Sequence, residues 1–333
     1  MTDAAFTVSF AGPLVTYQDT GRRGHMRYGV SASGPMDRLA FDAAHAALGN
    51  LHGQTAIEIS LGGLALTCSS GAVSFAVTGG DFVIEHRGRK HGSWTVLTAE
   101  AGDRITIRGG TSGSWAYLAF AGSVGCTEWL GSAATHAASG FGGGAVQSGQ
   151  TLRVANATVR EERSGAVPRP SFVTDGPVRV VTGPQDQHFA QDALEKFLTE
   201  RFAVTDAYDR MGMRLRGPEL PLAGALSIPS EPIVRGSVQV SGDGVPTVLL
   251  ADHQTTGGYP KIATAIASDT DRLVQFRSGQ TLRFAALSGA QAIETVRGYL
   301  AQKTAYLAQI AVPRGTLGQR LMRENLNHGW VLD

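Results

Sequence analysis

The sequence SGQTLR at residues 148–153 returns unchanged at residues 278–283, late in each half of a 333-residue chain. In both copies a glycine turn leads into alternating polar and apolar residues, which is typical of the start of a β-strand. A looser third copy, AGDRI, occupies residues 101–105. Turn-then-strand sequences are stereotyped, so chance also produces such matches. We interpret the repeat as a sign of two similar β-domains, one in each half of the chain.

Short apolar runs separated by glycine-containing turns extend this pattern along the chain. Such runs are typical of a β-rich barrel rather than of a parallel sheet with alternating helices. The predicted strands include residues 6–10, 57–61, 73–77, 104–108, 115–120, 178–182, 248–250 and 282–285. The predicted fold class is therefore mainly β with a few helices.

Three segments have helical periodicity instead. Residues 36–48 and 186–202 each align apolar side chains on one face, and a third apolar stripe covers residues 293–310. Ser33 is the predicted N-cap of the first helix, with Pro35 in its first turn.

A polar stretch that contains Pro168 and Pro170 separates the two halves. This stretch gives the predicted boundaries, which are an N-terminal domain at residues 1–165, a C-terminal domain at 172–311 and a tail at 312–333.

The composition favours a globular protein, with 42% hydrophobic residues and a formal net charge of +1. The absence of a basic run or stripe argues against nucleic-acid binding. The sequence lacks a secretory signal, and no apolar run approaches the ~20 residues of a membrane span. The two cysteines, Cys68 and Cys126, cannot form a disulfide framework. We therefore predict a cytoplasmic protein that binds neither nucleic acid nor a membrane.

The densest group of polar side chains lies between two apolar strands, in ADHQTTGGYPK at residues 251–261. The paired glycines allow the backbone to approach a ligand and to present N–H groups to an anion. A hairpin that satisfies its own backbone is the alternative, but so many different groups exceed what a turn requires. The predicted binding residues of this loop are Asp252, Gln254, Thr255, Thr256, Gly257, Gly258, Tyr259 and Lys261.

Two other regions add polar side chains to this prediction. Arginine is suited to bidentate capture of a carboxylate or a phosphate, although a structural ion pair is an equally open alternative for Arg210 and Arg214. The further candidates are Arg210, Arg214 and Gln239 in the C-terminal half, and Gln18, Asp19 and Arg22 among glycines near the N-terminus. The nine histidines show no metal-ligand spacing, so no metal site is predicted. Neither a G-x-S-x-G elbow nor a Walker phosphate loop is present.

Seven strings resemble the successive motifs of one family. They are GPLVTYQDTGRRG (12–24), GVSASGPMDRLA (29–40), LGSAATHAASGFGG (130–143), TGPQD (182–186), DRMGMRL (209–215), SEPIVRGSVQV (230–240) and LLADHQTTGGYPKIA (249–263). This is the biotin-dependent carboxyltransferase-like family, which includes the C subunit of 5-oxoprolinase, allophanate hydrolase subunit 2 and the antagonist of the sporulation kinase inhibitor. The resemblance implies two tandem cyclophilin-like β-barrel domains. The family usually has tyrosine where this chain has His136 and Met213, and the loss of a phenol at Met213 is expected to alter ligand choice.

The resemblance also implies a function. The chain would be the C subunit of a complex that converts 5-oxo-L-proline to L-glutamate, with ATP used through the complex. Its partners would be a B subunit, similar to allophanate hydrolase subunit 1, and a separate A subunit. In this role Asp252, Lys261 and Tyr259 would be catalytic, and the other candidate residues would bind the small-molecule substrate.

Two alternatives remain open. One is carboxyl transfer from carboxybiotin to a urea- or amide-like acceptor, with biotin supplied by another protein. The other is a non-catalytic antagonist of a kinase inhibitor.

Overall fold

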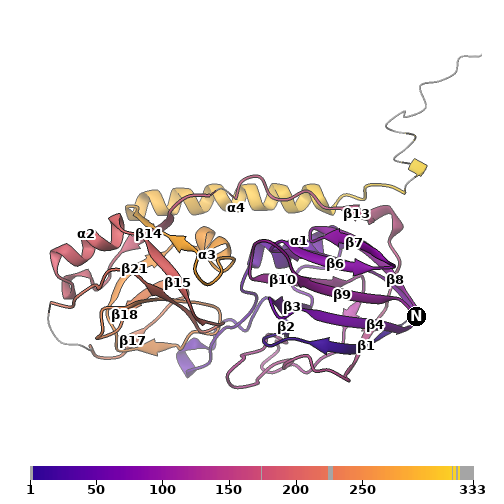
Figure 1. The fold of residues 1–333 in the computed structure, drawn as a ribbon, viewed down its shortest axis with the longest axis horizontal. Helices are drawn as coiled ribbons and strands as arrows, with labels where there is room; N and C mark the ends of the chain where they lie inside the picture. Colours follow the sequence, from indigo (N-terminus) through magenta and orange to yellow (C-terminus); the bar gives the residue numbers. More distant parts are fainter. Residues whose placement is uncertain (1–2, 174, 224–227, 317, 320–321, 323–333) are drawn as a thin grey trace, which may run out of the picture.

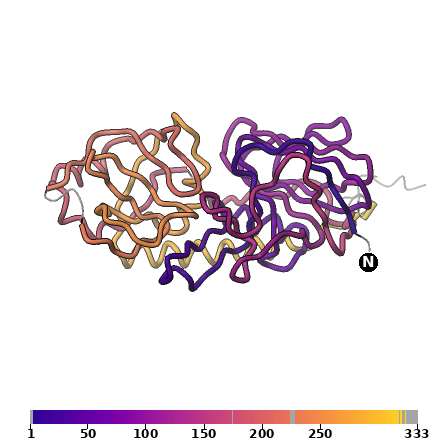
Figure 2. Tube along the Cα trace, turned by 90° about the horizontal axis from the view of Figure 1, so that it is seen from below, coloured from indigo at the N-terminus to yellow at the C-terminus, as the bar shows by residue number. Residues whose placement is uncertain are grey.

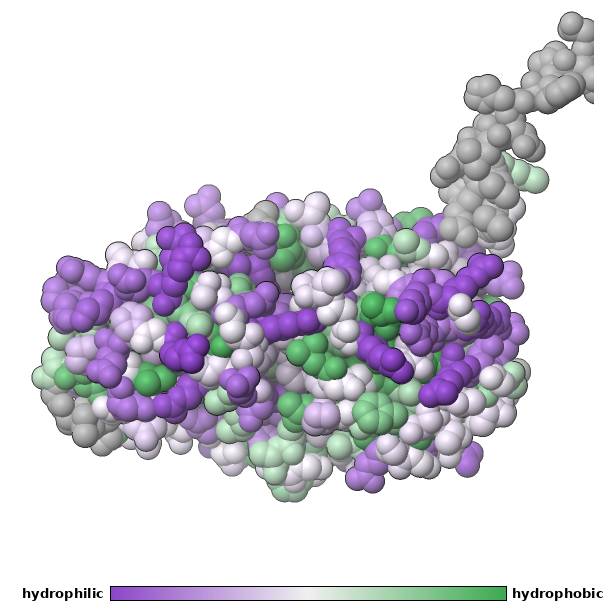
Figure 3. Space-filling view, viewed as in Figure 1, coloured by the Kyte–Doolittle hydropathy of each residue, from purple (hydrophilic) through white to green (hydrophobic). Residues whose placement is uncertain are grey.

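The computed structural model describes residues 3–173, 175–223, 228–316, 318–319 and 322. Most of the predicted tail at 312–333 lies outside these residues. The regular secondary structure of the described chain is mainly strand, arranged in two bodies side by side, and one long helix runs along both (Figures 1 and 2). This confirms the prediction of a mainly β protein with a few helices. On the face seen in Figure 3, hydrophobic residues form small separate groups among hydrophilic ones.

Two sheets form the N-terminal half. One has the strand order β11-β12-β1-β4-β9-β6-β7 and the other β13-β8-β5-β10-β3-β2. Helix α1 (Arg38–Leu48) packs on strands β5 and β10. The strands are β1 (Ala4–Ala11), β2 (Thr16–Gln18), β3 (Ala56–Ser60), β4 (Leu64–Ser70), β5 (Ala72–Gly79), β6 (Phe82–His86), β7 (Arg89–Gly92), β8 (Thr95–Glu100), β9 (Arg104–Gly109), β10 (Trp115–Phe120), β11 (Ser123–Val124), β12 (Thr151–Ala155) and β13 (Gly165–Ala166).

The C-terminal half is built on one sheet with the order β22-β15-β16-β19-β18-β21-β14-β23, beside a two-stranded ribbon of β17 and β20. The strands are β14 (Val178–Thr182), β15 (Phe202–Tyr208), β16 (Gly212–Arg216), β17 (Glu231–Pro232), β18 (Ser237–Val240), β19 (Pro246–Leu249), β20 (Thr256–Gly257), β21 (Lys261–Ala265), β22 (Thr281–Leu282) and β23 (Phe284–Ala286). The helices are α2 (Gln191–Thr199), α3 (Ala267–Leu273) and α4 (Gly289–Ala311), and single 3-10 turns lie at Met26–Tyr28, Glu161–Arg163 and Asp186–His188.

The SGQTLR repeat is also a structural repeat. In the first copy Gly149 N donates to Val8 O of β1 at 2.8 Å, and Val8 N donates to Gln150 O at 2.9 Å. In the second copy Gly279 N donates to Val204 O of β15 at 2.8 Å, and Val204 N donates to Gln280 O at 2.9 Å. Equivalent turns therefore close equivalent strand pairs in the two halves.

Each half of the molecule has its own apolar core, and each core also includes residues from the opposite half. Tyr306 and Ile310 of α4 belong to the N-terminal core, whereas Met36 and Trp115 belong to the C-terminal core. The exact domain boundaries stay a prediction. The two α4 residues in the N-terminal core explain how this helix of the C-terminal half reaches the N-terminal half in Figure 1.

The helices differ from the sequence prediction in two places. The predicted helix at 186–202 is shorter, because Phe202 is buried and begins strand β15. Helix α3 was missed, since its seven residues ASDTDRL carry no apolar stripe.

The N-cap of α1 also differs from the prediction. Ser33 has a left-handed φ of 53°, and Asp37 caps the helix by accepting from Ala40 N at 2.8 Å. The other carboxyl oxygen of Asp37 accepts from Gln275 Nε2 of the C-terminal half at 2.8 Å. Burial, with a contribution from the nearby Asp271, raises the pKa of Asp37 to about 7.

The difference in free energy of unfolding between Asp37→Asn and wild type is expected to shift in favour of the variant as the pH rises from 5 to 8. Asparagine caps a helix about as well as aspartate, whereas the buried carboxyl of Asp37 must lose its proton inside the fold. The pKa of Asp37 is higher in the folded than in the unfolded chain. The free energy of unfolding of wild type therefore falls by about 1.4 kcal/mol per pH unit as the pH rises between the two pKa values. Urea unfolding of both proteins at several pH values measures the difference.

Subtracting the two free energies of unfolding at each pH removes the contributions of other titrating groups. One of these is His45, because burial lowers the pKa of His45 to about 4. A difference between the two proteins that is the same at pH 5 and pH 8 would contradict the assignment.

Candidate functional site

A buried ion network joins the two halves at the centre of the molecule. Arg210, in the turn between β15 and β16, is 1% exposed and forms ion pairs with Glu58 of β3 and with Asp252, just after β19. Its Nε and Nη2 donate to the two carboxyl oxygens of Asp252 at 2.9 and 2.8 Å. Nη2 also donates to Gly34 O at 2.8 Å. One guanidinium thus holds segments from both halves.

Both carboxylates of this network are committed to partners. Glu58 accepts from Met36 N at 2.8 Å and from the Tyr117 hydroxyl at 2.7 Å. Asp252 Oδ2 accepts from Ala137 N at 2.9 Å. Burial alone would raise the pKa of Asp252, but the Arg210 guanidinium holds it below its ordinary value. Asp252 is therefore an ionised group that fixes the geometry around it.

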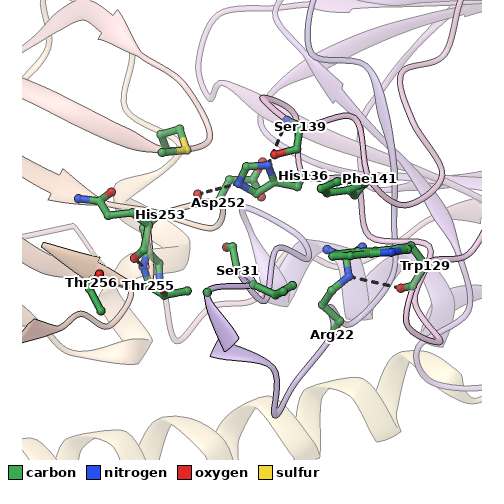
Figure 4. Close-up of a pocket in the computed structure, with 14 residues that line it drawn as sticks. Arg22, Ser31, Trp129, His136, Ser139, Phe141, Asp252, His253, Thr255 and Thr256 are labelled. Carbon is green, nitrogen blue, oxygen red and sulfur yellow. Dashed lines mark hydrogen bonds between the residues drawn. The ribbon is translucent and has the colours of Figure 1, made fainter. Parts of the chain in front are cut away.

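A cavity of about 300 Å³ lies beside this network, between the two halves. Figure 4 places Arg22, Trp129 and Phe141 on one side, and His253, Thr255 and Thr256 on the other. Asp252 and Gln254 also line it. Residues 252–256 of the polar loop therefore supply one wall of the cavity, and the facing wall comes from the N-terminal half.

Arg22 is held on the N-terminal wall by main-chain oxygens and an aromatic ring. Its Nη2 donates to Ala134 O, and its Nε donates to Trp129 O at 3.4 Å. Its Cζ lies 5.1 Å from the centre of the Trp129 ring. That ring stacks on Phe141 at 4.3 Å. Burial lowers the pKa of Arg22, although Asp19 and Asp252 oppose the shift.

Two histidines of the cavity were not among the predicted site residues. His136 Nε2 lies 3.3 Å from Asp252 O, and its Nδ1 lies 3.2 Å from Ser139 N. A carbonyl only accepts and an amide only donates, so these partners assign a neutral ring with the proton on Nε2. His253 Nδ1 lies 2.6 Å from Gln254 O, which assigns the proton to Nδ1 and leaves Nε2 as an acceptor. Burial lowers the pKa of His253.

Among the predicted residues that lie outside the cavity lining, three bond to other groups of the protein. Gln18 donates to Thr16 Oγ1 at 2.9 Å and to Thr135 O at 3.1 Å. Asp19 accepts from Gly21 N at 2.8 Å and from Ser132 Oγ and Ala133 N at 2.7 Å each. Arg214 forms an exposed ion pair with Asp243 at 2.6 Å. Of the two alternatives left open for Arg214, the structure shows the structural ion pair.

The remaining candidates surround the β17–β20 ribbon rather than line the cavity. Lys261 is buried, and its Nζ lies 3.5 Å from Glu231 and donates to Pro232 O at 3.4 Å. Gln239 Nε2 donates to Tyr259 O at 3.2 Å, and Gln254 Nε2 donates to Gln239 Oε1 at 3.3 Å. Gln254 therefore connects this group to the cavity.

Two glycines of the ribbon region, Gly257 and Gly258, pack closely. A Cβ on Gly257 would lie 2.8 Å from Gln239 Nε2, and one on Gly258 would lie 2.9 Å from Ile228 O. The main-chain oxygen near Gly258 favours glycine at that position, whereas the atoms near Gly257 are the ends of flexible side chains. The binding role of both glycines stays a prediction.

Met213 also has a different setting from the one expected. It is fully buried in the C-terminal core, whereas Met211 lines the cavity. The expected effect of Met213 on ligand choice therefore has no structural basis at this cavity.

The described part of the chain contains no group of three His, Cys, Asp or Glu side chains placed to hold a metal ion. None of the described helices is long and apolar enough to cross a membrane.

Comparison with known proteins gives concordant matches. The family model described as carboxyltransferase domain, subdomain A and B, matches residues 28–286. A Haemophilus influenzae protein, named as the C subunit of 5-oxoprolinase, is 33% identical over 298 residues, which are 89% of this chain and 94% of that protein. An Escherichia coli protein of the same name is 31% identical over 289 residues, 85% of this chain and 92% of that protein.

A crystal structure supports the same grouping. The urea amidolyase of K. lactis superposes with a TM-score of 0.80 at 25% identity, over 92% of this chain and 20% of that protein. The chain thus spans about a fifth of that enzyme. The match and the sheets described above confirm the predicted tandem β-barrel fold.

Proposed function

The chain belongs to the carboxyltransferase domain (subdomain A and B) family, and from this premise we propose that it is the C subunit of an ATP-dependent 5-oxoprolinase. The complex would open the lactam of 5-oxo-L-proline with water, yielding L-glutamate, while ATP is hydrolysed. The observation that carries the proposal is the 33% identity to a protein of that name over 94% of its length. The B and A subunits are the proposed partners, and ATP would be bound through the complex.

The cavity between the halves has the chemistry that such a substrate requires. Its volume of about 300 Å³ lies at the lower end of the range for small-molecule sites. Opening a lactam places negative charge on the carbonyl oxygen, which hydrogen-bond donors stabilise. Thr255 and Thr256 offer hydroxyl donors, and Gln254 offers an amide. Asp252 acts as a positioning residue, because its carboxylate is taken up by Arg210 and its main-chain oxygen holds His136.

The catalytic roles of Lys261 and Tyr259 are part of the proposal. Neither side chain lines the cavity, so in these roles they would act at the cleft formed with the B subunit, where Lys261 would stabilise negative charge that develops during the reaction. In the described structure its ammonium is held under the β17–β20 ribbon by Pro232 and Glu231.

Glutamate release from 5-oxoproline and ATP tests the function. This chain, co-purified with its candidate A and B partners, is expected to yield glutamate, whereas a mixture that lacks this chain is expected to yield none. Lys261→Met should abolish most of the activity in a complex that still assembles. Lys196→Met, which removes an exposed helix lysine paired with Asp192, is the matched control. A complete, stable complex without glutamate formation would contradict the proposal.

Carboxyl transfer from carboxybiotin is the second candidate, favoured by the structural match to urea amidolyase. In this case another protein would supply biotin, and a urea- or amide-like molecule would accept the carboxyl group. Transfer of labelled carboxylate from carboxybiotin to urea, with no glutamate formed from 5-oxoproline, would select this function.

A further inference from the structure

We propose that Arg22 is the anion anchor of the cavity and binds the carboxylate of a small carboxylic acid that also carries an amide or lactam. The identification of that acid as 5-oxoproline rests on the proposed function. The anchor itself rests on the charge and the contacts of Arg22.

The positive charge of Arg22 is buried without a counter-charge in contact. The side chain is 2% exposed. Within the described residues its hydrogen bonds go to two neutral main-chain oxygens, and Nη1 has no partner. A buried charge is costly unless an opposite charge compensates it. This arrangement favours a bound anion.

The two carboxylates nearest to Arg22 in charge interactions, those of Asp19 and Asp252, are already bound to other groups. Asp19 accepts from Gly21 N, Ser132 Oγ and Ala133 N. Asp252 is paired with Arg210. Both act on Arg22 only through space. The compensating anion therefore has to come from outside this set of residues.

The guanidinium is also fixed in place before a ligand binds. Two carbonyls and the ring of Trp129 hold it, and Phe141 stacks on that ring. A group that is already ordered loses little conformational entropy on binding. Arginine in such a setting suits a carboxylate, because its fork matches two oxygens.

The opposite wall selects the rest of the ligand. His253, Thr255 and Thr256 face Arg22 across the cavity in Figure 4. The neutral His253 ring offers an acceptor at Nε2, and the threonines offer donors. An amide or lactam N–H and carbonyl match these groups. The cavity thus fits a molecule with a carboxylate at one end and an amide at the other.

Calorimetric titration of the purified full-length chain tests the anchor without turnover. The probes are 5-oxoproline, its primary amide, which lacks the charge, and succinamate, an open-chain amide acid. We expect the primary amide to bind about tenfold to hundredfold more weakly than 5-oxoproline, the range for a charge-assisted hydrogen bond. Because the change is made in the ligand, the protein remains wild type and its folding is not in question.

Protein variants then assign the effect to one residue. Arg22→Gln should weaken 5-oxoproline binding by about the same factor and leave binding of the primary amide unchanged, and Arg22→Lys should recover part of the loss. Arg214→Gln, which removes an exposed arginine, is the matched control. Equal binding of 5-oxoproline and its amide, or no binding of either acid to the chain, would overturn the proposal.

The titration separates the anchor from the proposed function. Arg22-dependent binding of succinamate without binding of 5-oxoproline would support the anchor and contradict the oxoprolinase assignment. Glutamate formation by a complex in which Arg22→Gln leaves KM unchanged would support the function and overturn the anchor.

Discussion

Replacing Arg210 with methionine is expected to lower the free energy of unfolding by about 3–5 kcal/mol, the range measured when one partner of a buried ion pair is removed. The substitution leaves Glu58 and Asp252 buried without their shared cation. Methionine has a similar length, so the loss reflects charge more than volume. Urea unfolding at neutral pH measures the change.

Arg214→Met is the matched control, since it makes the same chemical change four residues away at an exposed pair with Asp243. It should cost at most about 1 kcal/mol. Adding Glu58→Gln and Asp252→Asn to Arg210→Met should recover part of the loss, because no buried charge then remains unpaired. Equal destabilisation by Arg210→Met and Arg214→Met would show that the network is not what holds the halves.

The pH dependence gives a second readout of the same network. The pKa of Asp252 is lower in the folded protein than its ordinary value. Its stabilising contribution is therefore present at neutral pH and lost as the pH falls through the folded pKa. The gap between wild type and Arg210→Met should narrow in acid.

Replacing Gly142 with alanine is expected to cost about 2–5 kcal/mol and to weaken ligand binding in the cavity. Gly142 has a φ of +94°, which costs an L-residue about 1–2 kcal/mol. An added Cβ would also clash with Ala134 O and would lie 2.9 Å from Arg22 Nη2. The shifts of neighbouring atoms that this added Cβ requires cost about 1–3 kcal/mol more, the range for overpacking.

The Gly144→Ala variant separates the cost of the positive φ from the cost of the close contact. Gly144 has a φ of +84°, but a Cβ there would meet nothing within 4 Å. This variant should show the backbone cost alone and should keep ligand affinity, as measured by thermal unfolding and calorimetry. If the two alanine variants behave alike, the contact of Gly142 with the Arg22 site is not a constraint.

The polar loop at 251–261 shows how much of the candidate site could be predicted from the sequence alone. It was found because its mixture of polar groups exceeds what a turn needs, and Gln254, Thr255 and Thr256 do line the cavity. Glu58 was missed, although a lone carboxylate within the apolar strand AIEIS was a signal for a buried ion pair. His136 and Trp129 were missed because their importance depends on a loop that closes against the other half.

The sequence by itself determined several of the strands, the two-part β architecture and the internal repeat, because alternation, glycine turns and repeated hydrogen-bonding chemistry are local properties. Only the tertiary structure decided which polar residues meet. Arg210 and Arg214 are four positions apart on adjoining turn and strand, yet one is buried between two carboxylates and the other is exposed. Residues 22 and 255 lie on facing walls of one cavity. Such pairings depend on burial and on contacts between distant segments, which local sequence patterns do not encode.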